Sequence, residues 1–264
     1  MSNSIFDAKN VNFAYLGKYS ALRNVDINIE RGQKISVIGA NGSGKSTLLH
    51  MLDGLIFPDE GTVKAFGREL AEDAFNDEDF SKDFRKKVGL VFQNPDIQLF
   101  CPTVREDIFF GPLQLGMEKK EIKKRFEELI TILGLGNLLE RAPHQLSIGE
   151  KRKVAIASTL IIEPEVLILD EPTAGLDPLT TRHIIDLLVQ ENASGRTIIT
   201  STHDLHIVEE ISDIVYVFSQ EKKIVKAGHP GVILQDAALL HVNNLTHIHA
   251  HSHNGKIHIH PHSH

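Results

Sequence analysis

The spacing of apolar residues changes along this chain from alternation to continuous runs. In the first thirty residues apolar and polar positions alternate, and the apolar members are Ile5, Val11, Phe13, Val25, Ile27 and Ile29. A period of two is typical of antiparallel strands with one solvated face. The N-terminal part of the chain is therefore predicted to form an antiparallel β subdomain.

Later apolar segments are short, continuous and rich in β-branched residues, as in strands buried on both faces. They cover residues 34–38, 88–92, 166–169, 197–201 and 214–218. Helical patterns lie between them, at residues 46–52, 119–133, 150–162 and 178–192. Strands that alternate with helices predict an α/β fold with a mainly parallel sheet.

Two further segments differ from this core. Residues 94–145 are mostly helical in pattern and predict an inserted helical subdomain, which we place at about residues 94–160 of a domain spanning 1–240. The remaining residues, 241–264, hold nine of the 15 histidines of the chain and predict a flexible, His-rich tail.

Composition and charge argue against several classes of protein. The 264 residues are 41% hydrophobic and 24% charged, which is ordinary for a globular protein. A formal net charge of −7 argues against a surface that coats nucleic acid. No apolar run is long enough to span a membrane, and the first residues lack the basic and then apolar pattern of a leader, so we do not expect secretion. The single cysteine, Cys101, fits a reducing cytosol.

A glycine-rich loop follows the predicted strand 34–38 and precedes the predicted helix 46–52. Its residues, in order, are Gly39, Ala40, Asn41, Gly42, Ser43, Gly44, Lys45 and Ser46. The pattern G-x-x-x-x-G-K-[ST] predicts a loop whose backbone N–H groups cradle the phosphates of a nucleotide. Lys45 would reach the terminal phosphates, and the Ser46 hydroxyl would bind Mg²⁺. A glycine turn without a ligand would not explain both Lys and Ser at these offsets.

Two adjacent carboxylates end the predicted strand 166–169. Asp170 is placed to hold Mg²⁺, and Glu171 to polarise a water for attack on the γ-phosphate. A polar strand end entering a turn at Pro172 would explain these two residues alone, but not their occurrence together with the phosphate loop.

Three more candidate motifs each lie at the end of a predicted strand or the start of a predicted helix. Gln93 follows strand 88–92, the sequence L-S-I-G-E at residues 146–150 opens helix 150–162, and His203 follows strand 197–201. With these, residues 5–240 resemble the ATP-binding cassette ATPases, which have a P-loop NTPase core.

The resemblance assigns roles by matching motifs. It implies that Tyr15 stacks on adenine, although Tyr15 or the nearby Tyr19 could instead pack beneath the first sheet. Gln93 matches the Q-loop, which completes the Mg²⁺ shell, and residues 174–177 match the D-loop. Lys45, Glu171 and His203 would be catalytic. The implied nucleotide-binding set is residues 39–46 with Tyr15, Thr47, Gln93, Ser147, Gly149 and Glu150.

Members of this family pair head to tail, so the resemblance implies a second copy or a paralogue as partner. Ser147 and Gly149 would then contact the γ-phosphate bound by the other subunit. The usual signature is L-S-G-G-Q, and here Ile148 replaces a glycine and Glu150 the glutamine. The bulk of Ile148 puts the tightness of closure in question.

Residues 92–100 and 103–116 are similar to the energy-coupling-factor ATPases, above all to the cobalt and nickel import group. This similarity implies separate integral-membrane subunits and a peripheral position at the cytoplasmic face of the cell membrane. Burial of Phe109 and Phe110 in the subdomain core is the alternative for that pair. A vitamin importer and a soluble, non-transport cassette ATPase remain alternative functions.

The histidines of the tail alternate with other residues in two copies of one pattern. They are His247, His249, His251, His253, His258, His260, His262 and His264. Because Asn254-Gly255 favours a two-residue turn, a hairpin would place His251, His249 and His247 opposite His258, His260 and His262. Such pairs could chelate Ni²⁺, Co²⁺, Zn²⁺ or Cu²⁺, and protonation near pH 6.5 would weaken the binding. Pro261 argues against a regular ladder, and we expect the tail to be disordered until metal binds.

Overall fold

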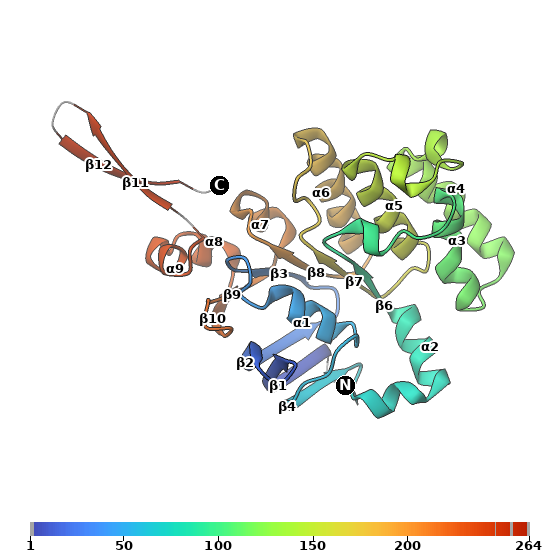
Figure 1. Ribbon diagram of the computed structural model, residues 1–264, viewed down its shortest axis with the longest axis horizontal. Coiled ribbons are helices and arrows are strands. Elements are labelled where there is room, and N and C mark those ends of the chain that lie inside the picture. The colour runs from blue at the N-terminus through green and yellow to red at the C-terminus, as the bar shows by residue number, and fades with distance from the viewer. Residues whose placement is uncertain (1–2, 246, 254–255, 263–264) are drawn as a thin grey trace. The chain divides into compact units, whose positions relative to one another are not determined.

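The computed structural model describes residues 3–245 and the backbone of residues 247–253 and 256–262 (Figure 1). The chain divides into two compact units, one formed by residues 1–71 and 199–264 and the other by residues 72–198. The strands of the six-stranded sheet are, in order, β10 (Ile224–Gly228), β9 (Ile214–Phe218), β3 (Lys34–Ile38), β8 (Thr197–Thr202), β7 (Val166–Asp170) and β6 (Val88–Val91). Strand β8 begins in the second unit and ends in the first.

The first unit contains the predicted antiparallel sheet. Its strands are ordered β2 (Tyr19–Glu30), β1 (Ser4–Tyr15), β4 (Glu60–Ala65) and β5 (Arg68–Glu69). Ala8 lies opposite both Ile27 on β2 and Val63 on β4, and all three side chains are buried. The alternation in the first thirty residues is therefore confirmed as one buried and one solvated face.

The rest of the first unit surrounds a parallel strand pair. Strand β3 (Lys34–Ile38) runs parallel to β9 (Ile214–Phe218), which pairs antiparallel with β10 (Ile224–Gly228). The helices of this unit are α1 (Lys45–Leu52), α7 (Leu205–Ile211), α8 (Pro230–Leu234) and α9 (Ala237–Val242). Leu240 and Leu245 still pack into the core with Ile38 and Val217. This apolar core thus includes residues on both sides of Asn243.

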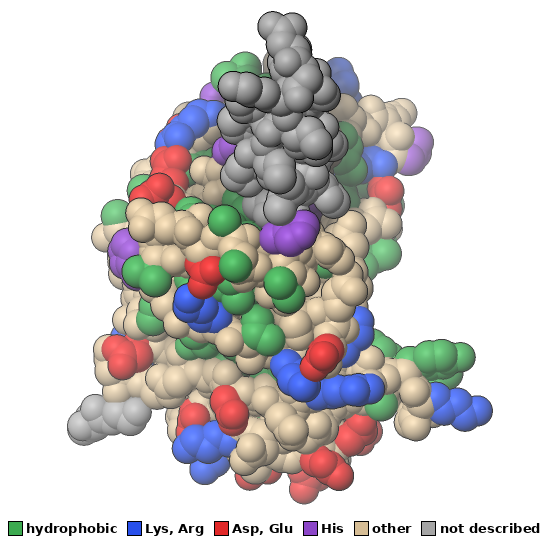
Figure 2. All heavy atoms as spheres, turned by 90° about the vertical axis from the view of Figure 1, so that its left-hand side faces the viewer, with side chains coloured by type: hydrophobic (Ala, Val, Ile, Leu, Met, Phe, Trp, Pro, Cys, Tyr) green, Lys and Arg blue, Asp and Glu red, His purple; other side chains and the backbone are tan. Residues whose placement is uncertain are grey.

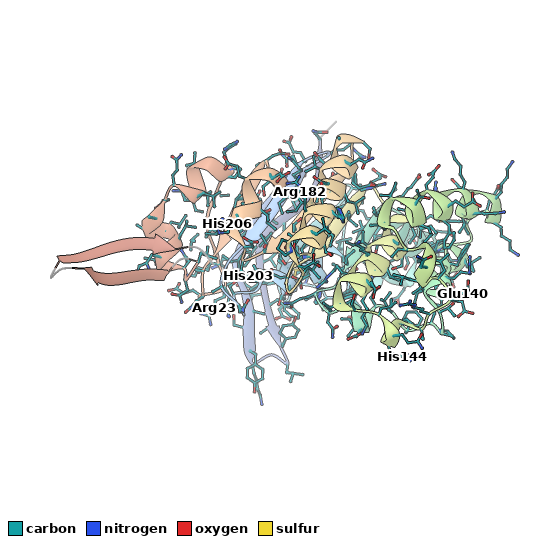
Figure 3. All side chains as sticks on the ribbon, turned by 90° about the horizontal axis from the view of Figure 1, so that it is seen from above. Arg23, Glu140, His144, Arg182, His203 and His206 are labelled. Carbon is teal, nitrogen blue, oxygen red and sulfur yellow. The ribbon has the colours of Figure 1, made fainter. Side chains whose placement is uncertain are left out.

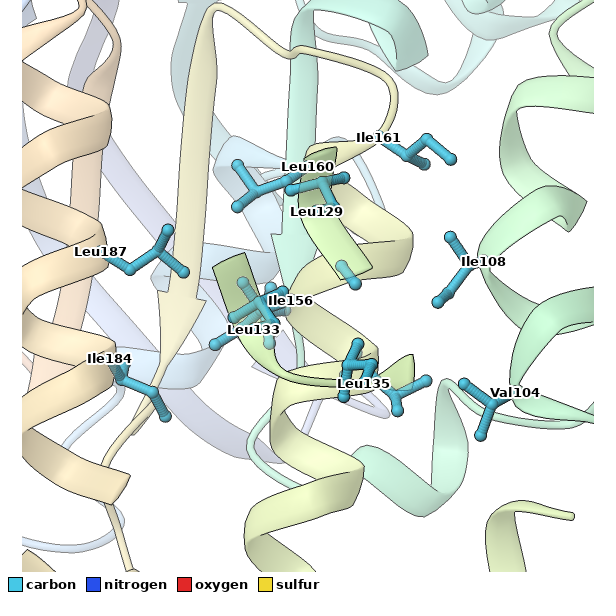
Figure 4. Close-up of a cluster of buried hydrophobic side chains, with 14 of the residues drawn as sticks. Val104, Ile108, Leu129, Leu133, Leu135, Ile156, Leu160, Ile161, Ile184 and Leu187 are labelled. Atoms are coloured by element: carbon cyan, nitrogen blue, oxygen red, sulfur yellow. The ribbon is translucent and has the colours of Figure 1, made fainter. Parts of the chain in front are cut away.

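The second unit is mainly helical. Strand β6 (Val88–Val91) runs parallel to β7 (Val166–Asp170). The helices are α2 (Glu78–Lys87), α3 (Val104–Gln114), α4 (Lys119–Leu133), α5 (Ile148–Leu160) and α6 (Pro178–Ala193), with 3-10 turns at Glu72–Asn76, Pro95–Ile97, Gly136–Leu138 and Pro143–Gln145. One apolar core joins α3, α4, α5 and α6, with Ile108, Ile156 and Ile184 among its residues (Figure 4).

The tail contains two strands, β11 (His247–His253) and β12 (Lys256–His262). They pair antiparallel, with His247 opposite His262, His249 opposite His260 and His251 opposite His258. This is the register predicted from the sequence. The β-branched isoleucines that alternate with the histidines favour the strands. The predicted turn residues Asn254 and Gly255, and His264, lie outside the described residues.

Candidate nucleotide-binding site

The phosphate loop lies in the first unit, between the buried strand β3 and helix α1. A Cβ at Gly39 would lie 2.6 Å from Ser43 Oγ and 2.9 Å from Phe218 Cβ. Gly44 has φ of +114°, and a Cβ there would lie 2.4 Å from the Ala21 carbonyl oxygen. Any larger residue at either position would displace backbone, so the spacing of these glycines is a steric requirement of the loop.

The loop presents polar groups that a phosphate would satisfy. Gly44 caps α1 without any side-chain hydrogen bond to the first N–H groups of the helix. Lys45 is buried and donates from Nζ to the carbonyl oxygens of Gly39 at 2.8 Å and Ala40 at 3.3 Å. Ser43 Oγ is buried and has no hydrogen-bond partner within the described part of the chain. These groups fit an anionic ligand of the triphosphate type.

Tyr15, at the end of β1, lies beside this loop. Its hydroxyl is 3.3 Å from Thr47 Oγ1, and its ring meets Phe13 edge-on with the ring centroids 5.0 Å apart. The Tyr19 side chain is 68% exposed and that of Tyr15 42% exposed. Of the two candidate aromatics, Tyr15 is therefore the one that the structure joins to the helix of the phosphate loop. Lys222, which we did not predict, donates to the Gly42 carbonyl oxygen.

His203 is exposed where β8 ends and α7 begins (Figure 3). The next residue, Asp204, is fixed at both ends, because its N–H donates to Thr202 Oγ1 at 3.0 Å and its carboxylate accepts from the N–H of His206 at 2.9 Å. This cap holds the backbone that carries the His203 side chain.

The two adjacent carboxylates lie in the second unit. Every residue of β7 is buried, Asp170 is 2% exposed and Glu171 is 4% exposed. Glu171 has φ of +47°, an uncommon conformation for a residue with a side chain, which costs on the order of 1 kcal/mol. Strain of this kind is typical of functional residues. Buried carboxylate oxygens at a strand end are also the hard ligands that Mg²⁺ prefers.

Arg152 lies close enough to these carboxylates to interact electrostatically and was not predicted as a site residue. Burial lowers the pKa of its guanidinium, and the negative charges of Asp170 and Glu171 act in the opposite direction. Its Nη1 and Nη2 donate to the carbonyl oxygens of Phe92 and Gln93, each at 2.7 Å. Arg152 thereby links helix α5 to the backbone of the predicted Q-loop.

Two more contacts fix the Q-loop segment to α5. The Gln98 amide donates to the Ala155 carbonyl oxygen at 2.9 Å and accepts from the N–H of Phe92 at 3.2 Å. Lys151 forms an ion pair with Asp96 at 2.6 Å. Residues 92–98 and the first turns of α5 are therefore held as one body, while the Gln93 side chain is exposed.

We expect Arg152→Met to reduce catalysis as well as stability. The change removes a buried cation and leaves two carbonyl oxygens without their donors, which costs about 3 kcal/mol in unfolding free energy. Urea unfolding and ATPase kinetics measure both effects, and we expect kcat to fall with ATP affinity unchanged. Arg152→Lys should recover part of kcat, and Lys153→Met is the control. Wild-type kcat in Arg152→Met would contradict a positioning role.

The signature residues open α5 with a capping box. Ser147 Oγ accepts from the Glu150 N–H at 3.3 Å, and Glu150 Oε2 accepts from the Ser147 N–H at 2.7 Å. This backbone hydrogen bond lowers the pKa of Glu150. Glu150 thus serves in the capping box as a glutamine would. Ile148 is 47% exposed, and a Cβ on Gly149 would lie 3.4 Å from Thr180 Cγ2.

Comparison with known proteins decides the family. The model of the family described as ABC transporter matches residues 22–174. The chain belongs to this family.

Relatives and solved structures agree with this assignment. The cassette is 49% identical to the nickel import ATP-binding protein NikO of Rhodobacter capsulatus, over 89% of this chain and 93% of that protein. It is 42% identical to the energy-coupling factor transporter ATP-binding protein EcfA of Methanocaldococcus jannaschii, over 91% of this chain and 85% of that one. The structure of cbiO1 from Clostridium perfringens, part of the ABC transporter complex cbiONQ, matches with a TM-score of 0.77, 35% identity and coverage of 92% and 96%. The predicted family and fold are confirmed, and the family activity is ATP hydrolysis coupled to transport.

An apolar surface lies on the cassette next to the Q-loop. Phe109 packs into the core against Phe126, with ring centroids 4.7 Å apart, whereas Phe110 pairs with Phe100 at 4.9 Å on the surface. The neighbouring pair of phenylalanines is thus divided between core and surface. We call the exposed side chains of Ile97, Phe100, Phe110 and Leu113, which are 42–64% exposed, the apolar surface.

Cys101 follows this surface and is held in a weakly reactive form. Burial and the carboxylate of Asp107 raise the pKa of its thiol to about 11. Asp107 is itself fixed by accepting from the N–H groups of Phe100 at 3.0 Å and Cys101 at 2.9 Å.

The cassette should therefore resist thiol alkylation at neutral pH. Since the thiolate is the reactive species, we expect iodoacetamide to modify Cys101 at pH 8 roughly 100-fold more slowly than a model thiol. The rate should rise steadily up to about pH 11. Mass spectrometry of timed samples measures the rate, and denatured protein is the control. Equal rates in folded and denatured protein would contradict the prediction.

Among the residues that the structure describes, no helix is both long and apolar enough to cross a membrane. On the face shown in Figure 2, Lys and Arg side chains are interspersed with Asp and Glu and form no continuous basic surface among the described residues.

Proposed function

We propose that this cassette is the ATP-hydrolysing subunit of a membrane complex that imports a divalent transition metal, nickel or cobalt. The observation that carries the proposal is the 49% identity to a nickel import ATP-binding protein over 89% of the chain. The cassette would be peripheral, at the cytoplasmic face of the membrane.

The residues of each unit suit steps of ATP hydrolysis. In the first unit, Lys45 and the uncapped N–H groups of α1 would bind the phosphates, and Tyr15 would stack on adenine. Ser46 in the first unit, and Asp170 and Gln93 in the second, carry oxygen atoms that would serve as Mg²⁺ ligands, and Mg²⁺ when bound neutralises charge on the phosphates. Glu171 would accept a proton from the attacking water, and His203 would contact the γ-phosphate.

A second cassette would complete each site. Ser147 accepts a hydrogen bond from Glu150, so its own hydroxyl proton stays available to donate to a phosphate on the partner. Gly149 adds no side chain at this end of the helix, and the Ile148 side chain at 47% exposure would lie at the subunit contact. The partner is a second copy or a paralogue.

The apolar surface is the proposed contact with integral-membrane subunits. Of this surface, Ile97 lies on the segment 92–98 that the Arg152, Gln98 and Lys151 contacts fix to α5, Phe100 follows that segment, and Phe110 and Leu113 lie on α3. Force applied there by a membrane subunit would move the Q-loop and the signature helix together. The apolar surface contains two aromatic and two aliphatic side chains, and such side chains are enriched at the centres of protein interfaces.

A vitamin-importing ATPase is the second candidate, because the 42% identity to the energy-coupling factor protein EcfA leaves the transported substrate open. Cells that express the cassette with its membrane subunits would be tested for uptake of radioactive nickel, radioactive cobalt and labelled vitamins. We expect nickel or cobalt uptake to rise and vitamin uptake to stay at the level of cells lacking the cassette. Vitamin uptake without metal uptake would overturn the metal proposal and support the alternative.

A further inference from the structure

The hairpin of β11 and β12 divides its residues between two chemically different faces. Directly opposite residues of an antiparallel pair share a face, and neighbours along a strand alternate. One face therefore carries four histidines of β11 and three of β12, namely His247, His249, His251, His253, His258, His260 and His262. The other face carries Ile248, Ala250, Ser252, Ile257, Ile259 and Pro261.

The register places four histidine positions at spacings that suit one metal ion. Opposite residues have Cβ atoms about 5 Å apart, and residues two apart along a strand are separated by about 6.7 Å. The pairs His249–His260 and His251–His258 are adjacent on the face, so four imidazole-bearing positions form a compact rectangle. Four nitrogen ligands complete a tetrahedral or square-planar shell around a late first-row divalent ion.

The ends of the face differ from its centre. At one end, His253 lies opposite Lys256, whose positive charge opposes metal binding. At the other end, His247 lies opposite His262, next to the Ile248–Pro261 pair on the reverse face. Pro261 removes one backbone donor next to His260, at a position on the reverse face of the hairpin. The central four positions are therefore the better site.

We propose that His249, His251, His258 and His260 form a binding site for a divalent transition-metal ion, assembled by the hairpin register. The proposal does not depend on the cargo, because a vitamin importer with this tail would bind the metal equally. Its prediction is geometric: affinity depends on which face the histidines share and not on how many the tail contains.

A variant of identical composition shows whether metal affinity follows the face that the histidines share or only their number. The changes I257H, H258I, I259H and H260I together keep the number of histidines and isoleucines but move two histidines of β12 to the other face. The full chain, this register variant and a chain truncated after Leu245 would be titrated with Ni²⁺ and with Zn²⁺ by calorimetry, without nucleotide.

We expect the full chain to bind about one ion at least 10-fold more tightly than either the register variant or the truncated chain. Far-UV circular dichroism checks that the three proteins share the same folded body. Equal affinity of the full chain and the register variant would overturn the hairpin site, because it would mean that chelation follows histidine number alone. Equal affinity of the full and truncated chains would overturn metal binding by the tail.

Discussion

Glu171→Gln is expected to lower ATP hydrolysis by at least about 100-fold while ATP binding persists. The amide keeps the size and hydrogen-bonding reach of the side chain but cannot accept a proton from water. Because Glu171 is 4% exposed, bulk water has little access to the position that its carboxylate occupies. The variant should accumulate as an ATP-bound closed dimer, measured by size-exclusion chromatography with Mg²⁺ and ATP.

The control for this variant is Glu209→Gln, which makes the same change at an exposed position of α7. It should hydrolyse ATP at the wild-type rate. A Glu171→Gln protein that also hydrolyses at the wild-type rate would show that another group activates the water.

Ser147→Arg is expected to abolish turnover by a different route. A long cationic side chain at the N-cap of α5 would occupy the space that the partner's phosphate must enter, and it removes the hydroxyl donor. Loss of one such donor alone costs roughly 100-fold in rate. Since Tyr15, Lys45 and Asp170 are unchanged, each chain should still bind ATP. Equilibrium binding of a fluorescent ATP analogue and steady-state hydrolysis measure the two properties.

Ser147→Arg also tests whether each ATP site is shared between two subunits. Mixing Ser147→Arg with Lys45→Met chains should restore part of the hydrolysis, because a mixed dimer contains one site with both intact halves. Ser194→Arg, at the exposed end of α6, is the control for adding an arginine. If the mixture stays inactive while mixed dimers form, the shared site is wrong.

The sequence predicted elements whose pattern is local. Helix α4 spans Lys119–Leu133 and strand β9 spans Ile214–Phe218, as their periodicities indicated. The phosphate loop was predictable because its glycines and Lys45 act within eight consecutive residues. The hairpin register followed from the alternation of histidines about a turn signal.

Contacts between distant segments could not be predicted in this way. Arg152 binds carbonyl groups about sixty residues earlier in the chain, and one charged residue in a helix does not indicate its partner. The same holds for Gln98, because the hydrogen bonds from its side-chain amide to α5 are visible only in the folded chain. The division of Phe109 and Phe110 between core and surface depends on the orientation of α3, which composition does not give.

ATP-driven metal transport is tested most directly in proteoliposomes that contain the complete complex with this cassette. Uptake of radioactive nickel and cobalt would be measured with ATP on the cassette side, for wild-type protein and for Glu171→Gln. We predict ATP-dependent accumulation of one of the metals with the wild type and none with the variant. Equal accumulation by wild type and variant, or ATP-dependent accumulation of a vitamin and of neither metal, would contradict the account.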